Sequence, residues 1–269
     1  MLATKYIARN YRNISRRWIK TLDVAVVGGG IMGSSSAYHL MKEKRDFKVG
    51  LFEQFELGHI MGSSHGDARL IRPTYPDETY VGMCMISFEG WDELSDEVGL
   101  KGDDKLQHMT GGLEIGTKGS DAVRLLEETL IKMGLQFSIM DGGDISKSFP
   151  QFSFDSDFIG IYCEKSGVLR ADDCLKAYNK ATTMMGGLLF PHHTLKSLSK
   201  HPDSDTFLLE FEIKSGEIER VESKEVVLTA GPWTSSQKLV TFLLIKYLCR
   251  WDLKTSRYIS ACSCDPRGC

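Results

Sequence analysis

The apolar and polar positions of the first hundred residues predict alternating strands and helices. The four apolar residues Val24–Val27 precede three glycines and then a segment with Ala37 and Leu40 on one side. A second apolar run follows at Val49–Phe52. An apolar run, a glycine turn and then helical spacing are typical of a strand–helix–strand unit. Apolar residues recur at helical spacing again from Tyr80 to Val98, which predicts an amphipathic helix.

The same patterning extends the prediction along the rest of the chain. We expect strands near Leu106–Ile115, a helix over Ser120–Met133, a hairpin-like pair of strands within 157–169, a helix over Cys174–Met185 that Asp172 caps, and strands at Leu188–Phe190, Phe207–Ile213 and Glu225–Thr229. Both faces of the last strand are apolar, which suits the centre of a parallel sheet. The whole pattern predicts an α/β fold built on a doubly wound parallel sheet.

The glycine turn has the spacing of a dinucleotide-binding fingerprint. Gly28 permits the tight bend, Gly30 lets backbone amides approach a pyrophosphate, and Gly33 lets the helix pack closely on the strand. The helix N-terminus adds free N–H groups and the positive end of its dipole. Glu53 ends the second strand, where its carboxylate could bind an adenosine ribose and would repel a 2′-phosphate, so NADP is disfavoured. The fingerprint does not separate NAD from FAD.

Composition narrows the class of protein. With 269 residues, 42% hydrophobic and 26% charged, the chain has the composition of a soluble globular protein with a sizeable core. A net charge of −3 argues against a nucleic-acid-binding surface. The cysteines follow no regular framework and no secretory signal is evident, so we expect a reducing compartment and no secretion. The segment nearest to a membrane span, Leu239–Ile245, ends at Lys246 and is too short, since a span needs ~20 apolar residues.

The two ends of the chain differ from the rest in composition. Residues 1–21 form a basic, acid-free extension that resembles a mitochondrial transit peptide, and a plain basic extension fits it as well. Four cysteines fall in the C-terminal tail, at Cys249, Cys262, Cys264 and Cys269. They lack the paired spacing of a zinc site and no histidine follows His201, so we expect no metal.

A basic run follows Glu53 closely enough to lie beside the nucleotide. If residues 65–72 are helical, His65, Arg69 and Arg72 share one face, before Pro73 discourages continuation. Two guanidinium groups there would form an anion receptor, suited to a reduced, anionic flavin or to a substrate carboxylate. A solvated basic face with a structural histidine is the alternative that spacing alone leaves open.

Three segments together resemble one enzyme family. They are Glu53-Gln54-Phe55, the Ser-Ser-His-Gly-x-x-Arg-x-Ile-Arg run at 63–72, and Thr229-Ala230-Gly231-Pro232-Trp233. Over about residues 22–239 the chain looks like the sarcosine oxidases and L-pipecolate oxidases of animal peroxisomes, which are FAD amine oxidases of the D-amino-acid-oxidase-like class. The resemblance implies FAD, a secondary amino acid (sarcosine or L-pipecolate) oxidised at its C–N bond by O2, and H2O2 as a product. It also implies a peroxisomal location and a monomeric complete form.

The resemblance implies a role for each matching residue. His65 would shape the amine pocket, Arg69 would lie against the flavin ring, and Arg72 would clamp the substrate carboxylate. The cofactor-binding positions are Gly28, Gly30, Ile31, Met32 and Gly33 at the pyrophosphate, Glu53 at the ribose, Ser63 and Ser64 beside the flavin, Leu195 near the adenine, and Gly231 and Trp233 at a third contact.

The resemblance also divides the chain. It implies an FAD-binding domain of residues 22–78 and 167–240, interleaved with a partial α+β substrate domain of residues 79–166. Residues 241–269 match nothing in the family, and its flavin-linking cysteine and second basic residue have no counterpart here, so the four tail cysteines are not assigned to flavin. We therefore expect either an active oxidase or a catalytically incomplete FAD-binding isoform or fragment of one. An NAD-dependent dehydrogenase is a third hypothesis, supported by the glycine fingerprint alone.

Overall fold

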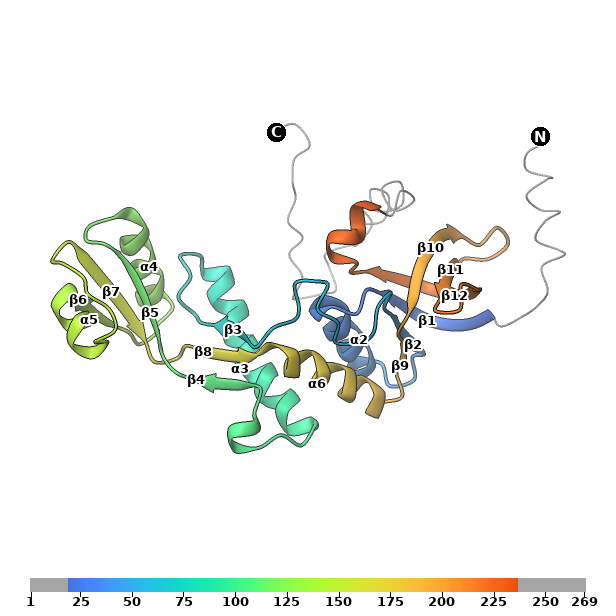
Figure 1. The fold of residues 1–269 in the computed structure, drawn as a ribbon, viewed down its shortest axis with the longest axis horizontal. Helices are drawn as coiled ribbons and strands as arrows, with labels where there is room; N and C mark the ends of the chain where they lie inside the picture. Colours follow the sequence, from blue (N-terminus) through green and yellow to red (C-terminus); the bar gives the residue numbers. More distant parts are fainter. Residues whose placement is uncertain (1–18, 237–269) are drawn as a thin grey trace.

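The structure, a computed structural model, describes residues 19–236, which form three sheets joined by helices along one long axis (Figure 1). The largest is a six-stranded sheet in the order β10-β11-β12-β1-β2-β9. Its strands are β1 (Ile19–Val27), β2 (Val49–Phe52), β9 (Leu188–Phe190), β10 (His193–Lys200), β11 (Phe207–Ile213) and β12 (Ile218–Leu228). β12, β1, β2 and β9 are parallel to one another, whereas β10, β11 and β12 pair antiparallel.

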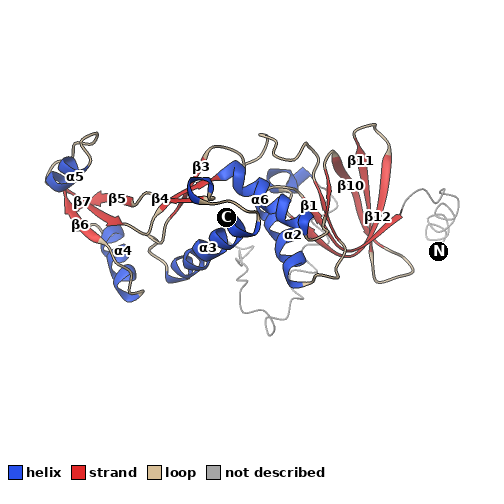
Figure 2. Cartoon of the chain, turned by 90° about the horizontal axis from the view of Figure 1, so that it is seen from below, coloured by secondary structure: helices blue, strands red, loops and turns tan. Residues whose placement is uncertain are grey.

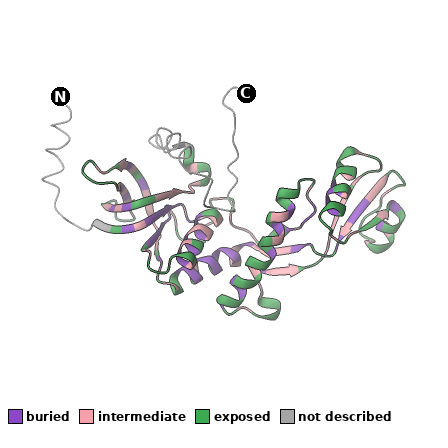
Figure 3. Ribbon diagram, turned by 180° about the vertical axis from the view of Figure 1, so that it is seen from behind, coloured by how far each residue is buried: buried purple, intermediate pink, exposed green. Residues whose placement is uncertain are grey.

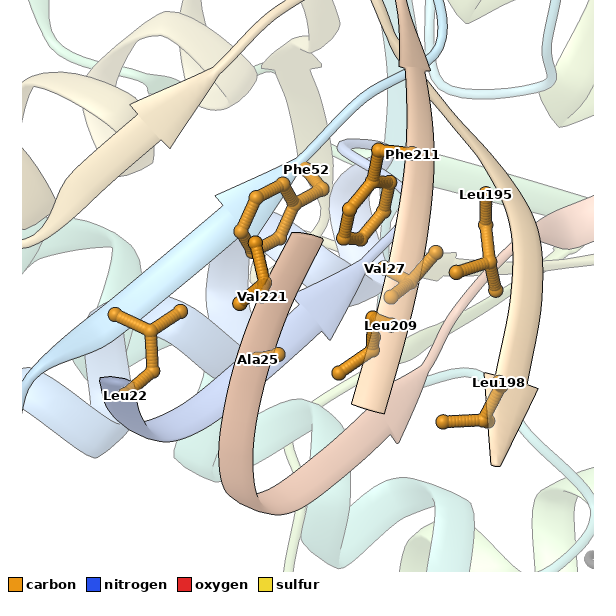
Figure 4. Close-up of a cluster of buried hydrophobic side chains, with 9 residues drawn as sticks. All are labelled: Leu22, Ala25, Val27, Phe52, Leu195, Leu198, Leu209, Phe211 and Val221. Atoms are coloured by element: carbon orange, nitrogen blue, oxygen red, sulfur yellow. The ribbon is translucent and has the colours of Figure 1, made fainter. Parts of the chain in front are cut away.

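Alternate residues of β1 face two different cores. Val24 and Val26 point toward α2 (Ile31–Glu43), where they pack with Ala37 and Met41. Ala25 and Val27 point to the opposite face, into a cluster that Leu209 and Phe211 of β11 complete (Figure 4). A strand that is buried on both faces needs apolar residues at consecutive positions, which explains the unbroken apolar run in this part of the sequence.

Two smaller sheets continue the molecule away from the large one (Figure 2). The middle sheet has the order β3-β8-β4 and the outer sheet β5-β7-β6. Their strands are β3 (Ala68–Ile71), β4 (Gln107–Met109), β8 (Gly167–Arg170), β5 (Gly112–Thr117), β6 (Ser138–Asp141) and β7 (Phe158–Cys163). The remaining helices are α3 (Glu78–Glu97), α4 (Asp121–Lys132), α5 (Gly142–Ser148), α6 (Ala171–Met184) and the short 3-10 helices η1 (Gly102–Asp104) and η2 (Gly231–Ser236).

Helix α6 joins the large sheet to the middle one. Its buried face packs against α2 and α3 through residues that include Tyr38, Leu94 and Tyr178. Figure 3 shows buried residues concentrated along α6 and the large sheet, while the outer helices α4 and α5 are largely exposed. In residues 19–236 no helix has both the length and the apolar character that crossing a bilayer requires.

Most of the predicted elements are confirmed, including the first two strands, α3, α4 and the strands from Leu188 onward. The helix considered for residues 65–72 does not form, because residues 68–71 form β3, which pairs with β8. The predicted hairpin within 157–169 is also wrong, since β7 pairs with β5 and β6, and β8 with β3 and β4. The basic extension up to residue 18, Leu239–Ile245 and the four tail cysteines lie outside the described residues.

Contrary to the prediction, Asp172 is not the N-cap residue of α6. Helix α6 starts at Ala171 with Arg170 at its N-cap position, which places Asp172 in the first turn. The Asp172 carboxylate accepts a hydrogen bond from the Gly66 amide at 2.8 Å, and the Asp172 amide donates to the Gly66 carbonyl at 3.2 Å. The two bonds fasten the loop before β3 to the helix. They also favour an extended chain after Gly66, whose φ of +118° already interrupts a helix.

We predict that Gly33→Ala lowers the free energy of unfolding by about 3 kcal/mol. A Cβ atom at Gly33 would lie 1.8 Å from the Gly28 carbonyl oxygen, so α2 would have to move off the turn. Gly82 in α3 is the matched control, because a Cβ atom there meets no atom within 4 Å. Gly82→Ala should stabilise the chain by about 0.5–1 kcal/mol. Urea unfolding of the full chain measures both, and equal effects would contradict the close packing at Gly33.

Candidate functional site

A cavity of about 280 Å³ lies where β1, β2 and β12 end. The glycine turn after β1, the end of β2 and the segment after β12 form three of its walls. Gly62, Ser63 and Ser64 add a fourth wall, and Leu175 of α6 and Leu195 of β10 close the remaining sides. The carboxyl edge of parallel strands is where α/β sheets bind their ligands.

The glycine turn directs the N-terminus of α2 into this cavity. Gly28 has a φ of +106°, and a Cβ atom on it would lie 2.4 Å from the Thr229 carbonyl oxygen. Gly30 is the N-cap residue and supplies no capping side chain. The Ile31 amide instead donates to the Ser64 hydroxyl at 2.9 Å, across 33 residues of sequence. No acidic residue occupies the first turn of α2, so the positive end of the helix is suited to an anion.

Glu53 places a buried carboxylate on the cavity wall. The residue is 5% exposed, and its Oε2 accepts a hydrogen bond from the Gly29 amide at 2.7 Å. Its Oε1 accepts from the Phe55 amide at 2.9 Å. A carboxylate has about four acceptor positions, so this one retains capacity for a ligand hydroxyl.

Thr229 binds the end of β12 to the glycine turn. Its amide donates to the Val27 carbonyl at 2.8 Å, and its hydroxyl lies within hydrogen-bonding distance of the carbonyls of Val27 at 3.0 Å and Gly28 at 2.9 Å. The chain then enters η2, where the Trp233 ring meets the Phe55 ring edge to face at 5.4 Å. The segment of residues 229–233, which follows β12, is thus a wall of the same cavity.

The cavity gathers most of the predicted cofactor-binding residues. Those that line it are Gly28, Gly30, Ile31, Met32, Glu53, Ser63, Ser64, Leu195, Gly231 and Trp233. Gly33 lies behind the turn, against the Gly28 carbonyl and the Thr229 hydroxyl. His65, Arg69 and Arg72 are not among the described residues that line the cavity.

Arg69 folds back onto the loop that carries the two serines. Its Nη2 donates to the carbonyls of Ser63 at 2.7 Å and His65 at 2.8 Å, and its Nη1 donates to Ala68 at 2.7 Å. Three carbonyl partners hold the guanidinium group beside the loop. The positive charge therefore lies next to the cavity wall without entering the cavity.

Arg72 binds a different set of partners. Its Nη1 lies 3.0 Å from Glu114 Oε1 of β5 and 2.9 Å from the Thr74 hydroxyl, and it also donates to the Thr74 carbonyl. The guanidinium carbon lies 4.8 Å from the centre of the Tyr75 ring. Residues three apart in an extended chain point to opposite sides, so the shared helical face expected for Arg69 and Arg72 does not form.

Eleven of the lining residues were not predicted as site residues, among them His59, Leu175, His193 and Thr229. His193 begins β10, and its ring lies 5.5–6.0 Å from the rings of Phe52, Phe190 and Phe211. The apolar pattern does not predict β10, whose regular pairing with β11 shifts between Leu195 and Ser197. The proximity of His59 to Glu53 in the sequence was the available signal for a second polar group at this wall.

The described cysteines are unsuited to chemistry at the cavity. Cys84, Cys163 and Cys174 are buried, and none of the three lines it. Burial raises the pKa of the Cys84 thiol and raises that of Cys174 to about 12, so both are protonated at neutral pH. Within residues 19–236 no three His, Cys, Asp or Glu side chains are grouped as metal ligands.

We predict that Glu53→Gln lowers the free energy of unfolding by about 1–3 kcal/mol. The amide group can replace only one of the two carboxylate oxygens, so the amide of Gly29 or that of Phe55 loses its acceptor. Glu56→Gln is the control, since the Glu56 side chain is 69% exposed, and its effect should stay within about 0.5 kcal/mol. Urea unfolding of the full chain measures both variants. A Glu53→Gln chain as stable as wild type would refute these two bonds.

Comparison with known proteins identifies the family. The profile of the family DAO, FAD dependent oxidoreductase, matches residues 23–248. Peroxisomal sarcosine oxidase of Mus musculus is 32% identical over 213 residues, which cover 79% of this chain and 51% of the relative. Putative sarcosine oxidase of Caenorhabditis elegans is 33% identical over 211 residues, covering 78% and 51%. The chain spans about half the length of the curated relatives it matches.

Solved structures agree on the fold. NikD, an unusual amino acid oxidase essential for nikkomycin biosynthesis, superimposes with a TM-score of 0.68 at 22% identity, covering 81% of this chain and 53% of NikD. Glycine oxidase of Geobacillus kaustophilus gives 0.67 at 19% identity, covering 83% and 58%. The family match confirms the prediction of FAD rather than NAD. The chain belongs to the DAO family of FAD-dependent oxidoreductases, with sarcosine oxidases among its relatives.

Proposed function

We propose that this chain binds FAD in the cavity and serves an oxidase that oxidises the C–N bond of a secondary amino acid, sarcosine or L-pipecolate, with O2 and release of H2O2. One observation carries the proposal: a glycine turn, a helix N-terminus and a buried carboxylate all border the same cavity. The sarcosine oxidases among its relatives support the substrate class.

The residues of the cavity fit the nucleotide half of FAD. A Cβ atom on Gly29 would lie 3.0 Å from Glu53 Cβ, and one on Gly30 would lie 3.1 Å from the Ser64 hydroxyl oxygen. Larger residues at either position would fill the space in which a pyrophosphate could contact the Met32 amide and replace the Ser64 hydroxyl as acceptor of the Ile31 amide. Glu53 would accept from the ribose, and Leu195 and Trp233 offer apolar surface to the ring systems.

The flavin side of the proposal rests on the loop that follows Glu53. FAD, when bound, would accept a hydride equivalent from the carbon beside the amine, which becomes an imine, and would pass the two electrons to O2 to give H2O2. Ser63 and Ser64 would border it, and Arg69 would add positive charge through a guanidinium group that three carbonyls hold in place. A fixed positive charge favours negative charge that develops beside it without reorganisation during the reaction. His65 would shape the amine pocket next to this loop.

Arg72 would hold the substrate carboxylate. Among residues 19–236, its hydrogen bonds and its ion pair all use Nη1, which leaves the edge formed by Nε and Nη2 for a second acceptor. A carboxylate matches that edge with two parallel hydrogen bonds. Glu114 and Thr74 would then fix the arginine from the opposite side. Because one side of the guanidinium group binds the protein and the other side is left for a ligand, the arrangement supports the proposal of a substrate with a carboxylate next to its amine.

We further propose that residues 22–78 and 167–240 form the FAD-binding domain and residues 79–166 part of the substrate domain. The complete protein would be a monomer. Its location would be peroxisomal, as in the names of the mouse and human relatives, and the basic N-terminus keeps mitochondria as the alternative. Because no described cysteine lines the cavity, flavin would be held without a covalent bond to residues 19–236.

The direct test is flavin binding and peroxide formation by the full chain. Purified wild-type protein should show a flavin absorption spectrum, release its flavin on acid precipitation, and form H2O2 with sarcosine or L-pipecolate. Gly30→Val is the control, because its side chain would fill the space against Ser64 and should abolish flavin binding. Wild-type protein that takes up no FAD would refute the proposal. Bound FAD without peroxide would support the catalytically incomplete FAD-binding form.

We predict that Arg72→Ala weakens binding of sarcosine to the flavin-loaded chain by about 1.5–3 kcal/mol, the loss of hydrogen bonds to a charged group. The measurement is the dissociation constant from changes in the flavin spectrum. Arg124→Ala on α4 is the control, since Arg124 pairs with Asp121 and Glu128 of its own helix and should leave the constant unchanged. An unchanged constant for Arg72→Ala would remove Arg72 from the substrate site.

A further inference from the structure

The wall of the cavity beside Glu53 contains a second polar group, the imidazole of His59. Its Nε2 lies 3.4 Å from Glu53 Oε1, and the two side chains are only 16% and 6% exposed. The His59 ring lies 4.8 Å from the Phe55 ring, which in turn contacts Trp233. His59 also lines the cavity itself. The imidazole is therefore held between the carboxylate and the aromatic wall.

The hydrogen bonding of His59 determines which nitrogen carries the proton. Its Nδ1 accepts a hydrogen bond from the Met61 amide at 3.0 Å. A nitrogen that accepts carries no proton, so the neutral ring is protonated on Nε2, which faces Glu53. The bond from the Met61 amide thus leaves the protonated nitrogen, Nε2, on the side of the ring that lies 3.4 Å from Glu53 Oε1.

The negative charge in the cavity explains why an N–H group beside Glu53 would be favourable. The described lining residues include the Glu53 carboxylate and two histidines, but no lysine or arginine. A dinucleotide brings two negative phosphates into the same cavity, and a buried carboxylate nearby opposes them. Hydrogen bonds to a carboxylate disperse its negative charge and fix its plane. The amides of Gly29 and Phe55 already bind it, and His59 is the side chain placed to add to them.

We propose that His59 is a positioning residue for the cofactor, which holds the Glu53 carboxylate in the orientation that accepts a ribose hydroxyl. This inference rests on the proposed FAD site and adds a residue to it. His59 acts through Glu53 and needs no contact with the flavin ring. His59 would affect binding of the adenosine half of the cofactor alone. A nucleotide that lacks the ribose hydroxyl should therefore bind equally well with or without the imidazole.

The test compares ADP with 2′-deoxy-ADP as competitors of FAD bound to the full chain. His59→Phe keeps the ring against Phe55 and removes the N–H group, whereas His59→Gln restores an N–H donor near the position of Nε2. His201→Phe is the matched control, because His201 follows β10 and is not among the lining residues. Urea unfolding establishes that each variant is folded.

We expect wild type, His201→Phe and His59→Gln to bind ADP about tenfold more tightly than 2′-deoxy-ADP, the factor for one hydrogen bond to a charged group. His59→Phe should lower the affinity for ADP about tenfold and leave the affinity for 2′-deoxy-ADP unchanged. The preference for ADP would then be lost. Equal weakening of both nucleotides would indicate a merely structural role and overturn the inference, as would no preference in wild type. A wild-type chain that binds neither FAD nor ADP would instead refute the proposed cofactor site, and the inference with it.

Discussion

The close approach of Thr229 to the glycine turn is the constraint on which the site depends. Thr229 lies within hydrogen-bonding distance of carbonyls at the end of β1, and the side of the turn facing it tolerates no Cβ atom at Gly28 or Gly33. Helix α2 starts at Ile31, directly after this closely packed turn, with Gly30 as its N-cap residue. The glycines therefore serve packing between strands as much as access for a ligand.

Elements that depend on residues close together in the sequence could be predicted, whereas elements that depend on distant partners could not. The apolar runs of β1 and β2 and the spacing from Gly28 to Glu53 are local, so the strand–turn–helix–strand unit and its carboxylate could be predicted from the residues themselves. The strand β3 could not, because it forms by pairing with β8 and because Asp172, 106 residues away, holds Gly66. Its sequence is compatible with a helix in isolation.

The residues of the candidate site also differ in whether nearby or distant parts of the sequence determine their surroundings. The roles predicted for Ser63, Ser64 and Trp233 came from the resemblance, since nothing in their spacing indicates a shared cavity. His59 and His193 were missed because a histidine in a loop or at a strand start has no periodic signal. Their surroundings are formed by remote residues, such as Phe211 around His193. The ion pair of Arg72 with Glu114 joins β5 to the chain after β3, and neither partner predicts the other.

The order of strands in the large sheet also has a consequence for synthesis of the chain. Strand β1 leaves the ribosome about 200 residues before its partner β12, as the bond between Thr229 and Gly28 illustrates. Domains are generally completed as units, and contacts of high sequence separation form late. Until β12 arrives, one edge of β1 has no strand to pair with and Gly28 has no neighbour to close the turn. During translation this edge would be available to chaperones, and capture of the cofactor would have to wait until nearly all of the described chain had been made.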